Sequence, residues 1–156
     1  MSVTLKRKVA ISFQATVWQD GAVQATSAFH VDGDLYIKDG CTYLTFKEER
    51  AHQEEEIQTT LKWDETTLLL IRRGAVTMRQ PFIDGQETCG RYVTAHMSCE
   101  TKATTEQLAV EVPLSRDEHG HIHVRYGFWL QGQETGVHEI RLRVMDREAE
   151  QGGTCS

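Results

Sequence analysis

Apolar side chains occupy every second position between Val3 and Val17, and this alternation constrains the fold more than any other feature. Arg7 is the one charged residue in the apolar phase, and polar residues fill the positions between. A period of two places successive side chains on opposite faces of a strand. The pattern predicts a long β-strand with one dry and one wet face. The apolar positions are Val3, Leu5, Val9, Ile11, Phe13, Ala15 and Val17.

The same alternation returns in residues 57–63, 76–82, 122–130 and 140–144. No segment shows a sustained helical stripe with capping residues. Strands joined by short turns predict an antiparallel meander. Strands of often about nine residues or more, against about 5–6 in a typical sheet, favour an all-β, closed, up-and-down barrel. The expected turn signals are Asp20-Gly21, Asp32-Gly33, Asp39-Gly40, Gly74, Asp84-Gly85, Gly120 and Gly132.

Length and charge favour one domain and argue against several classes of partner. The chain has 156 residues and a formal net charge of −6. Nucleic-acid affinity comes largely from Lys and Arg on phosphates, so no nucleic-acid partner is expected. No stretch approaches the roughly 20 apolar residues that cross a bilayer, so no membrane partner is expected either. We expect one barrel domain over residues 1–146 and a flexible tail over residues 147–156.

Cysteine usage and the N-terminus point to the cytoplasm. The N-terminus has no apolar run of signal-peptide length. The cysteines show no CxxC spacing, and we interpret them as reduced thiols. They are Cys41, Cys89, Cys99 and Cys155.

The segment DEHGHIHVRYGFW, residues 117–129, is rich in histidine. If the even positions from Ile122 to Leu130 face the interior, His121 and His123 project outward beside Arg125. Two histidines at i and i+2 on a strand can chelate zinc, so a metal site stays an alternative. A third ligand would have to come from a neighbouring strand, and no HExxH or Cys/His spacing supports it. We expect a solvated face, with no metal and no other cofactor.

The segment LLLIRRGAVTMRQPFIDG, residues 68–85, resembles the YwiB-like family of small bacterial β-barrels. The spacing RxGAVxMxQxF carries the resemblance, with YLTFKEE before it and GRYVTAHMSCETK after it. The family is a domain of unknown function. The resemblance implies a calycin-like (lipocalin-like) barrel and offers no established activity. The matching positions are Tyr43, Leu44, Glu48, Arg72, Gly74, Ala75, Val76, Met78, Gln80, Phe82, Gly85, Tyr92, Lys102, Gly120, Ile122 and Tyr126.

Several polar residues fall in the phase of the barrel interior. Glu48, Gln80 and His138 are each in phase with apolar neighbours on their own strand. Arg72 joins them if it follows the phase of Leu68 and Leu70, although apolar residues occupy both phases there. Burying a charge costs several kcal/mol per ion, whereas burying a large apolar side chain contributes roughly 1.5–3 kcal/mol. Stability alone does not explain such residues.

Two explanations remain open. These groups orient a small anionic or amide-bearing ligand in a wet cavity, or they form an internal network that fixes strand register without a ligand. The candidate ligand-binding residues are Glu48, Arg72, Gln80, Tyr92, Tyr126 and His138.

Enzymatic activity has little support. The sequence contains no GxSxG, P-loop or GxGxxG motif, and we assign no catalytic residue. An acid–base pair of Glu48 and His138 inside the barrel stays an alternative.

A protein-interaction role is a further alternative. The segment KEERAHQEEE, residues 47–56, is either a solvated connection or a dock for a basic partner. Trp18 and Trp129 lie on outer strand faces, where they either form an exposed aromatic patch or pack under neighbouring groups. We expect a monomer or a weak homodimer.

Overall fold

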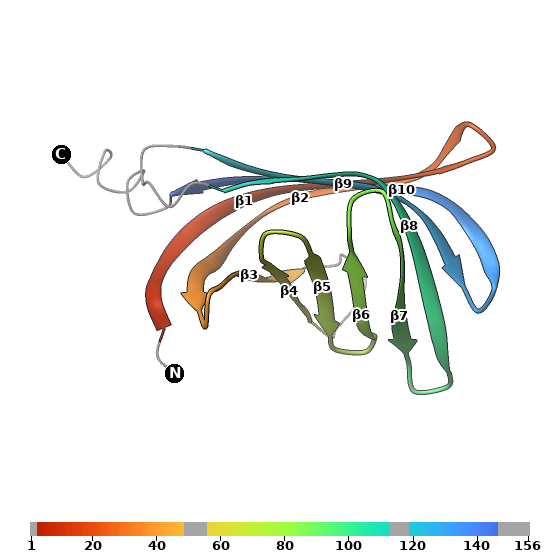
Figure 1. The fold of residues 1–156 in the computed structure, drawn as a ribbon, viewed down its shortest axis with the longest axis horizontal. Helices are drawn as coiled ribbons and strands as arrows, with labels where there is room; N and C mark the ends of the chain where they lie inside the picture. The colour runs from red at the N-terminus through yellow and green to blue at the C-terminus, as the bar shows by residue number, and fades with distance from the viewer. Residues whose placement is uncertain (1–2, 49–55, 113–118, 147–156) are drawn as a thin grey trace.

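The computed structural model describes residues 3–48, 56–112 and 119–146, with side chains from Lys6 onward. All regular structure in these ranges is β-strand (Figure 1). The predicted tail, residues 147–156, and most of the KEERAHQEEE segment lie outside the described residues. The strands are β1 (Val3–Gln19), β2 (Ala22–Lys38), β3 (Cys41–Glu48), β4 (Ile57–Trp63), β5 (Leu68–Arg73), β6 (Thr77–Phe82), β7 (Glu87–Val93), β8 (Ser98–Glu111), β9 (Gly120–Leu130) and β10 (Gln133–Asp146).

The strands form one closed antiparallel barrel in which each pairs with its neighbours in the sequence. β10 returns beside β1, with Ile140 opposite Ala15 and Val144 opposite Ile11, and this pair closes the wall. The predicted all-β, up-and-down barrel is therefore confirmed, and the calycin-like label is consistent with it. Within the described ranges no helix is long and apolar enough to cross a membrane.

The strands differ in length more than the sequence pattern predicts. β1, β2, β8, β9 and β10 contain 11–17 residues, whereas β3 to β7 contain only 6–8. In Figure 1 the long strands form one curved sheet, and the hairpin of β1 and β2 projects beyond the short strands. The short strands β3 to β7 therefore do not extend to the end of the barrel that the β1–β2 hairpin forms.

The apolar phase of each strand faces the interior, as the alternation predicts. A continuous core runs through β1 to β6 and β8 to β10, and burying each large apolar side chain contributes roughly 1.5–3 kcal/mol. Arg7, the charged residue in this phase, is also buried and faces Asp146 across the closing pair, with Nη1 and Oδ2 3.9 Å apart. The core includes Val9, Ile11, Leu35, Leu44, Leu61, Leu70, Phe82, Ile122, Val124 and Leu142.

One predicted turn is wrong. Asp32-Gly33 lies inside β2, where a Cβ on Gly33 would come within 2.6 Å of the Thr45 carbonyl oxygen and 2.7 Å of Ile11 Cδ1. Glycine is needed there because neighbouring strands approach closely. The signals at Asp20 and Asp39 do mark turns: both residues have φ of 54°, and the glycine after each is also at positive φ.

Candidate functional site

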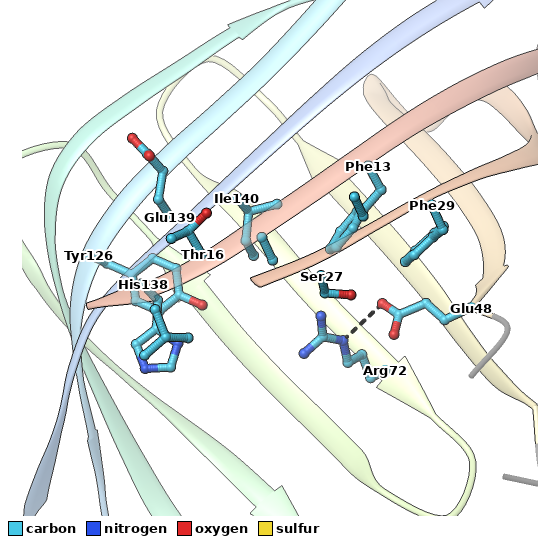
Figure 2. A pocket seen from close by; sticks show the side chains of 13 residues that line it. Phe13, Thr16, Ser27, Phe29, Glu48, Arg72, Tyr126, His138, Glu139 and Ile140 are labelled. Carbon is cyan, nitrogen blue, oxygen red and sulfur yellow. Dashed lines mark hydrogen bonds and ion pairs between the residues drawn. The ribbon is translucent and has the colours of Figure 1, made fainter. Parts of the chain in front are cut away.

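A cavity of about 580 Å³ lies inside the barrel toward the end where β1 turns into β2 (Figure 2). Small side chains leave this space, because Ala15 and Ser27 pair across β1 and β2 and both line the cavity. Phe13 and Phe29 form its apolar wall and stack with ring centroids 4.6 Å apart. Bulkier residues fill the interior farther along the same strands.

Arg72 enters this cavity from β5 and bonds to Glu48 at the end of β3. Its Nε donates to Glu48 Oε1 at 3.3 Å, and the Thr59 hydroxyl donates to the same oxygen at 2.9 Å. The Glu48 side chain is 4% exposed, whereas that of Arg72 is 21% exposed. Arg72 therefore shares the inward phase of Leu68 and Leu70, which the sequence left undecided.

The terminal nitrogens of Arg72 point away from Glu48 into the cavity (Figure 2). They make no hydrogen bond to any residue that the structure describes, since Nε alone contacts Glu48. A guanidinium carries five N–H donors in a rigid fork that matches carboxylate geometry. Arg72 thus offers unused donors inside the barrel.

His138 lines the same cavity and is a neutral imidazole at pH 7. Burial, together with the positive charge of Arg72, lowers its pKa from 6.5 to about 4. The Thr135 hydroxyl donates to the Phe128 carbonyl oxygen at 3.0 Å and lies 2.9 Å from His138 Nε2. Because the hydroxyl proton is already committed, Nε2–H must donate to Thr135, which leaves His138 Nδ1 as an acceptor.

Tyr126 contributes a protonated phenol to the cavity. Burial raises the pKa of Tyr126 to about 12, although the charge of Arg72 acts in the opposite direction. Its ring stacks on His138 with centroids 5.4 Å apart and also contacts the ring of Phe82, with centroids 4.5 Å apart. The Tyr126 hydroxyl has no hydrogen-bond partner among the described residues, so it is a second available group.

Gln80 and Tyr92 lie elsewhere in the barrel and do not line this cavity. Gln80 is fully buried, accepts a hydrogen bond from the Thr101 hydroxyl and donates to the Pro81 carbonyl oxygen at 2.9 Å. Tyr92 is half-buried against the core, opposite Met78. The structure thus brings together Glu48, Arg72, Tyr126 and His138 and leaves the other two candidates apart. Glu48 and His138, the suggested acid–base pair, have different partners.

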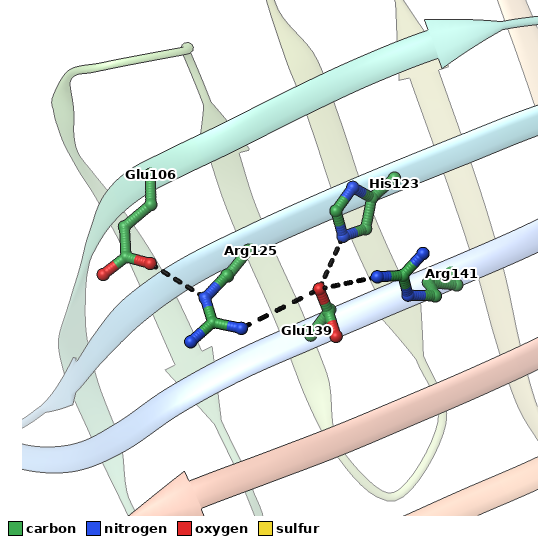
Figure 3. A network of polar contacts seen from close by, with 5 residues as sticks. All are labelled: Glu106, His123, Arg125, Glu139 and Arg141. Atoms are coloured by element: carbon green, nitrogen blue, oxygen red, sulfur yellow. Dashed lines mark hydrogen bonds and ion pairs between the residues drawn. The ribbon is translucent and has the colours of Figure 1, made fainter. Parts of the chain in front are cut away.

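His121 and His123 lie on the outer face of β9, as predicted. His123 takes part in an ion-pair network (Figure 3). His123 Nε2 lies 2.6 Å from Glu139 Oε2, and Arg141 and Arg125 approach the same oxygen at 3.3 and 4.0 Å. Arg125 also bonds to Glu106 at 2.9 Å. Burial alone would raise the pKa of Glu139, but the hydrogen bond from His123 and the charge of Arg141 hold it below its usual range.

Within the described ranges the outer face holds no cluster of metal ligands, and Trp18 and Trp129 each lie beside a cation. No group of three or more His, Cys, Asp and Glu side chains is placed to hold a metal ion there. Trp18 lies under Arg125, with Cζ 4.8 Å from the ring centroid, and Trp129 lies under Lys102 at 4.9 Å. Each tryptophan therefore makes a cation–π contact with a neighbouring basic side chain.

Comparison with known proteins gives this chain a family. Residues 11–142 match a family described as "Domain of unknown function (DUF1934)". The chain belongs to this family. It is also similar to the "Uncharacterized beta-barrel protein YwiB" of Bacillus subtilis (strain 168), at 26% identity over 139 residues that span 88% of this chain and 94% of that protein.

The DUF1934 chain is similar in structure to the crystal structure of the ywiB protein from Bacillus subtilis. The TM-score is 0.78 at 23% identity, covering 92% of this chain and 94% of that one. These matches confirm the predicted resemblance and the barrel fold. They do not assign an activity.

Sequence reasoning about this DUF1934 chain missed the residues that create the cavity. Ala15 and Ser27 matter because they are small, and Phe13 and Phe29 because they stack across two strands. Ala15 was visible as the smallest member of the apolar phase of β1. Its pairing with Ser27 could not be foreseen, because a regular hairpin at Asp20-Gly21 would pair Ala15 with Thr26, and a register shift between Val17 and Trp18 moves the partner to Ser27.

Proposed function

We propose that this DUF1934 barrel binds a small ligand bearing a carboxylate or an amide in the cavity at Arg72. One observation supports the proposal above all: the Arg72 terminal nitrogens face a cavity of about 580 Å³ while its Nε is held by Glu48. Ligand sites commonly measure about 300–1,000 Å³ and place a few polar groups among apolar walls. Arg72 supplies the polar group, and Phe13 with Phe29 supplies the apolar wall.

The charges around the cavity favour a ligand with one acceptor group rather than a polyanion. Glu48 offsets the charge of Arg72, and His138 and Tyr126 are both neutral at pH 7. A carboxylate would receive bidentate hydrogen bonds from Arg72, and a carbonyl oxygen would receive one or two. A ligand with several negative groups would also meet Glu48 and the net charge of −6.

The experiment compares Arg72→Leu with Arg73→Leu on the same strand. Arg73 is exposed on the outer face, so its loss controls for charge without touching the cavity. A panel of small carboxylates and primary amides is titrated into ¹⁵N-labelled protein and followed by NMR. We expect saturable shifts around the cavity in the wild type and in Arg73→Leu, and none in Arg72→Leu. The proposal fails if no member of the panel shifts the cavity signals of the folded wild type.

If Arg72→Leu does not fold, the double variant Arg72→Gln/Glu48→Gln replaces it. This variant removes both charges together and retains hydrogen-bonding groups toward Thr59. Loss of binding in the folded double variant supports the proposal. Retention of the wild-type affinity contradicts it.

The second candidate is a structural barrel whose polar interior only fixes strand register. Gln80 favours it, because this fully buried side chain is bonded to Thr101 and Pro81 and does not line the cavity at Arg72. Under this function Arg72 and Glu48 form a further structural pair. The same titration separates the candidates, since a structural barrel shows no saturable shift.

We place either role in the cytoplasm. The free thiols of Cys41, Cys89 and Cys99 support this location, because reducing conditions keep such thiols unpaired.

A further inference from the structure

Part of β2 has a neighbouring strand on one side only among the residues that the structure describes. β2 pairs with β1 along its length but with β3 only from Gly33 to Lys38. Within residues 3–48, 56–112 and 119–146, the segment Ala22–Val31 therefore pairs with β1 alone; we call it the β2 edge. The outward N–H and C=O groups of such an edge form a template for another strand.

The composition of the β2 edge suits pairing with a further strand, because the edge lacks the residues that normally prevent such pairing. Its sequence, AVQATSAFHV, contains no Lys, Arg, Asp, Glu or Pro. Natural edges are usually blunted by charges, prolines or bulges, because an open edge invites pairing with other chains. Val23 is 57% exposed there, although it is a large apolar side chain. The edge thus keeps the features that strand addition requires.

The β2 edge also borders the cavity. Ser27 and Phe29 belong to the edge and line the cavity, and Glu48 and Arg72 line it from the opposite side (Figure 2). Pairing between β2 and β3 ends at Gly33 and Phe46, so among the described residues no strand lies between the β2 edge and the end of β3. A strand added beside Ser27 would lie there, next to the terminal nitrogens of Arg72.

We infer that the ligand is an extended peptide segment that adds as a strand to the β2 edge and places its C-terminal carboxylate on Arg72. This inference rests on the proposed function and narrows its ligand to a peptide with a free carboxyl terminus. Main-chain hydrogen bonds to the edge supply affinity, and pockets select alternate side chains. Phe13 and Phe29 would contact an apolar side chain near the terminus, and Arg72 would recognise the carboxylate.

A second copy of this chain fits the β2 edge less well. Its own β2 edge has no carboxylate between Ala22 and Val31 with which to contact Arg72. Each copy also carries a net charge of −6, so two copies repel one another over a distance. A peptide carries a single terminal charge and meets neither obstacle.

The test uses N-acetylated pentapeptides in which Val, Ile, Phe or Tyr alternates with Thr, each in a free-acid and a C-terminally amidated form. N-acetylglycine is the short carboxylate control, because it can reach Arg72 but is too short to pair along the β2 edge. Affinity is measured by calorimetry, and amide exchange of Ala22–Val31 by NMR. We expect the free acid to bind at least about tenfold more tightly than the amide and to slow exchange of the outward amides of the edge at least about tenfold.

Proline at two successive edge positions separates strand addition from simple loss of fold. Successive residues of a strand direct their N–H groups to opposite sides, so one of Ala25→Pro and Thr26→Pro removes an outward N–H and the other breaks the pairing with β1. Neither residue lines the cavity. The variant that keeps the melting temperature closer to the wild type identifies the outward N–H. It should bind the free-acid peptides at least about tenfold more weakly and N-acetylglycine as the wild type does.

The outcomes separate this inference from the proposed function. If N-acetylglycine binds at Arg72 and the peptides bind no more tightly, strand addition is wrong and small-ligand binding stands. If the outward amides of the β2 edge, which do not bond to β1, are already protected without peptide, another strand occupies the edge. That strand belongs to a second copy if the protection depends on protein concentration. If no carboxylate of any length shifts the cavity signals, both proposals are wrong.

Discussion

Arg72 Nε and Glu48 Oε1 lie 3.3 Å apart at the wall of the cavity, and the two side chains differ in burial. Glu48 is almost fully buried, whereas about a fifth of the Arg72 side chain is exposed to solvent. Removing the arginine therefore leaves a buried carboxylate, whereas removing the carboxylate leaves a guanidinium that water can reach. Substituting Arg72 should therefore lower the free energy of unfolding more than substituting Glu48 does.

Arg72→Leu should lower the free energy of unfolding by about 1–3 kcal/mol, below the 3–5 kcal/mol of a fully buried pair because water enters the cavity. Glu48→Gln should cost less, since the amide can still accept from Thr59. The double variant Arg72→Leu/Glu48→Leu should recover part of the loss. Urea denaturation of all three measures the difference. Equal costs for the two single variants would mean that the asymmetry has no energetic effect.

The buried imidazole of His138 should make stability depend on pH between about 4 and 6.5. Its folded pKa of about 4 lies below the unfolded value of 6.5, so the unfolded chain binds more protons in this window. The contribution of His138 to the free energy of unfolding is therefore fully present above pH 6.5. It falls by about 1–3 kcal/mol as the pH drops toward 4.

His138→Gln should remove that part of the pH dependence. His121→Gln is the matched control, because His121 is exposed on the outer face of β9. Urea denaturation at pH 7, 5.5 and 4.5 gives the slopes. A His138→Gln variant with the same slope as the wild type would show that His138 is not the group responsible.

Ala15→Leu should fill the cavity, because Ala15 faces it opposite Ser27. We expect stability to change by less than about 1 kcal/mol, since the added methyl groups occupy space that is already present. Binding of carboxylates should be lost. Ala109→Leu, at an exposed position of β8, is the control and should bind as the wild type does. Unchanged affinity in Ala15→Leu would place the binding site elsewhere.

Glu139→Ala should destabilise the barrel by about 1–2 kcal/mol, because it leaves Arg125, Arg141 and His123 facing one another without their shared carboxylate. Glu106→Ala removes a more exposed partner of Arg125, and its cost should stay below about 0.5 kcal/mol. Thermal denaturation at low and high salt measures both. Equal effects would show that burial of Glu139, the centre of the network in Figure 3, adds nothing to its stabilising effect.

The barrel could be predicted from the sequence because side-chain phase is a local property. Glu48, Gln80 and His138 each fall in phase with apolar neighbours of their own strand, and the structure places all three on the inner face. Arg72 was undecided because both phases of β5 are apolar, and only its pairing with Glu48 fixes its direction.

The cavity could not be predicted, because it depends on which inward residues share one level of the barrel. Gln80 and Arg72 both lie on the inner face, yet Gln80 bonds to Thr101 while Arg72 reaches Glu48. Strand phase does not distinguish these surroundings. Gly33 was also misread, since an Asp-Gly pair in a strand that needs close approach has the same letters as one in a turn.

The most direct test of ligand binding at Arg72 is an NMR titration of the wild-type protein with small carboxylates, observed at the arginine side-chain ¹⁵N signals. We predict saturable shifts of the Arg72 guanidinium together with the Tyr126 and His138 ring signals, absent from Arg72→Leu and from Ala15→Leu. Shifts confined to the outer-face residues Arg125 and Arg141, or no saturable shift with any carboxylate, would contradict the account.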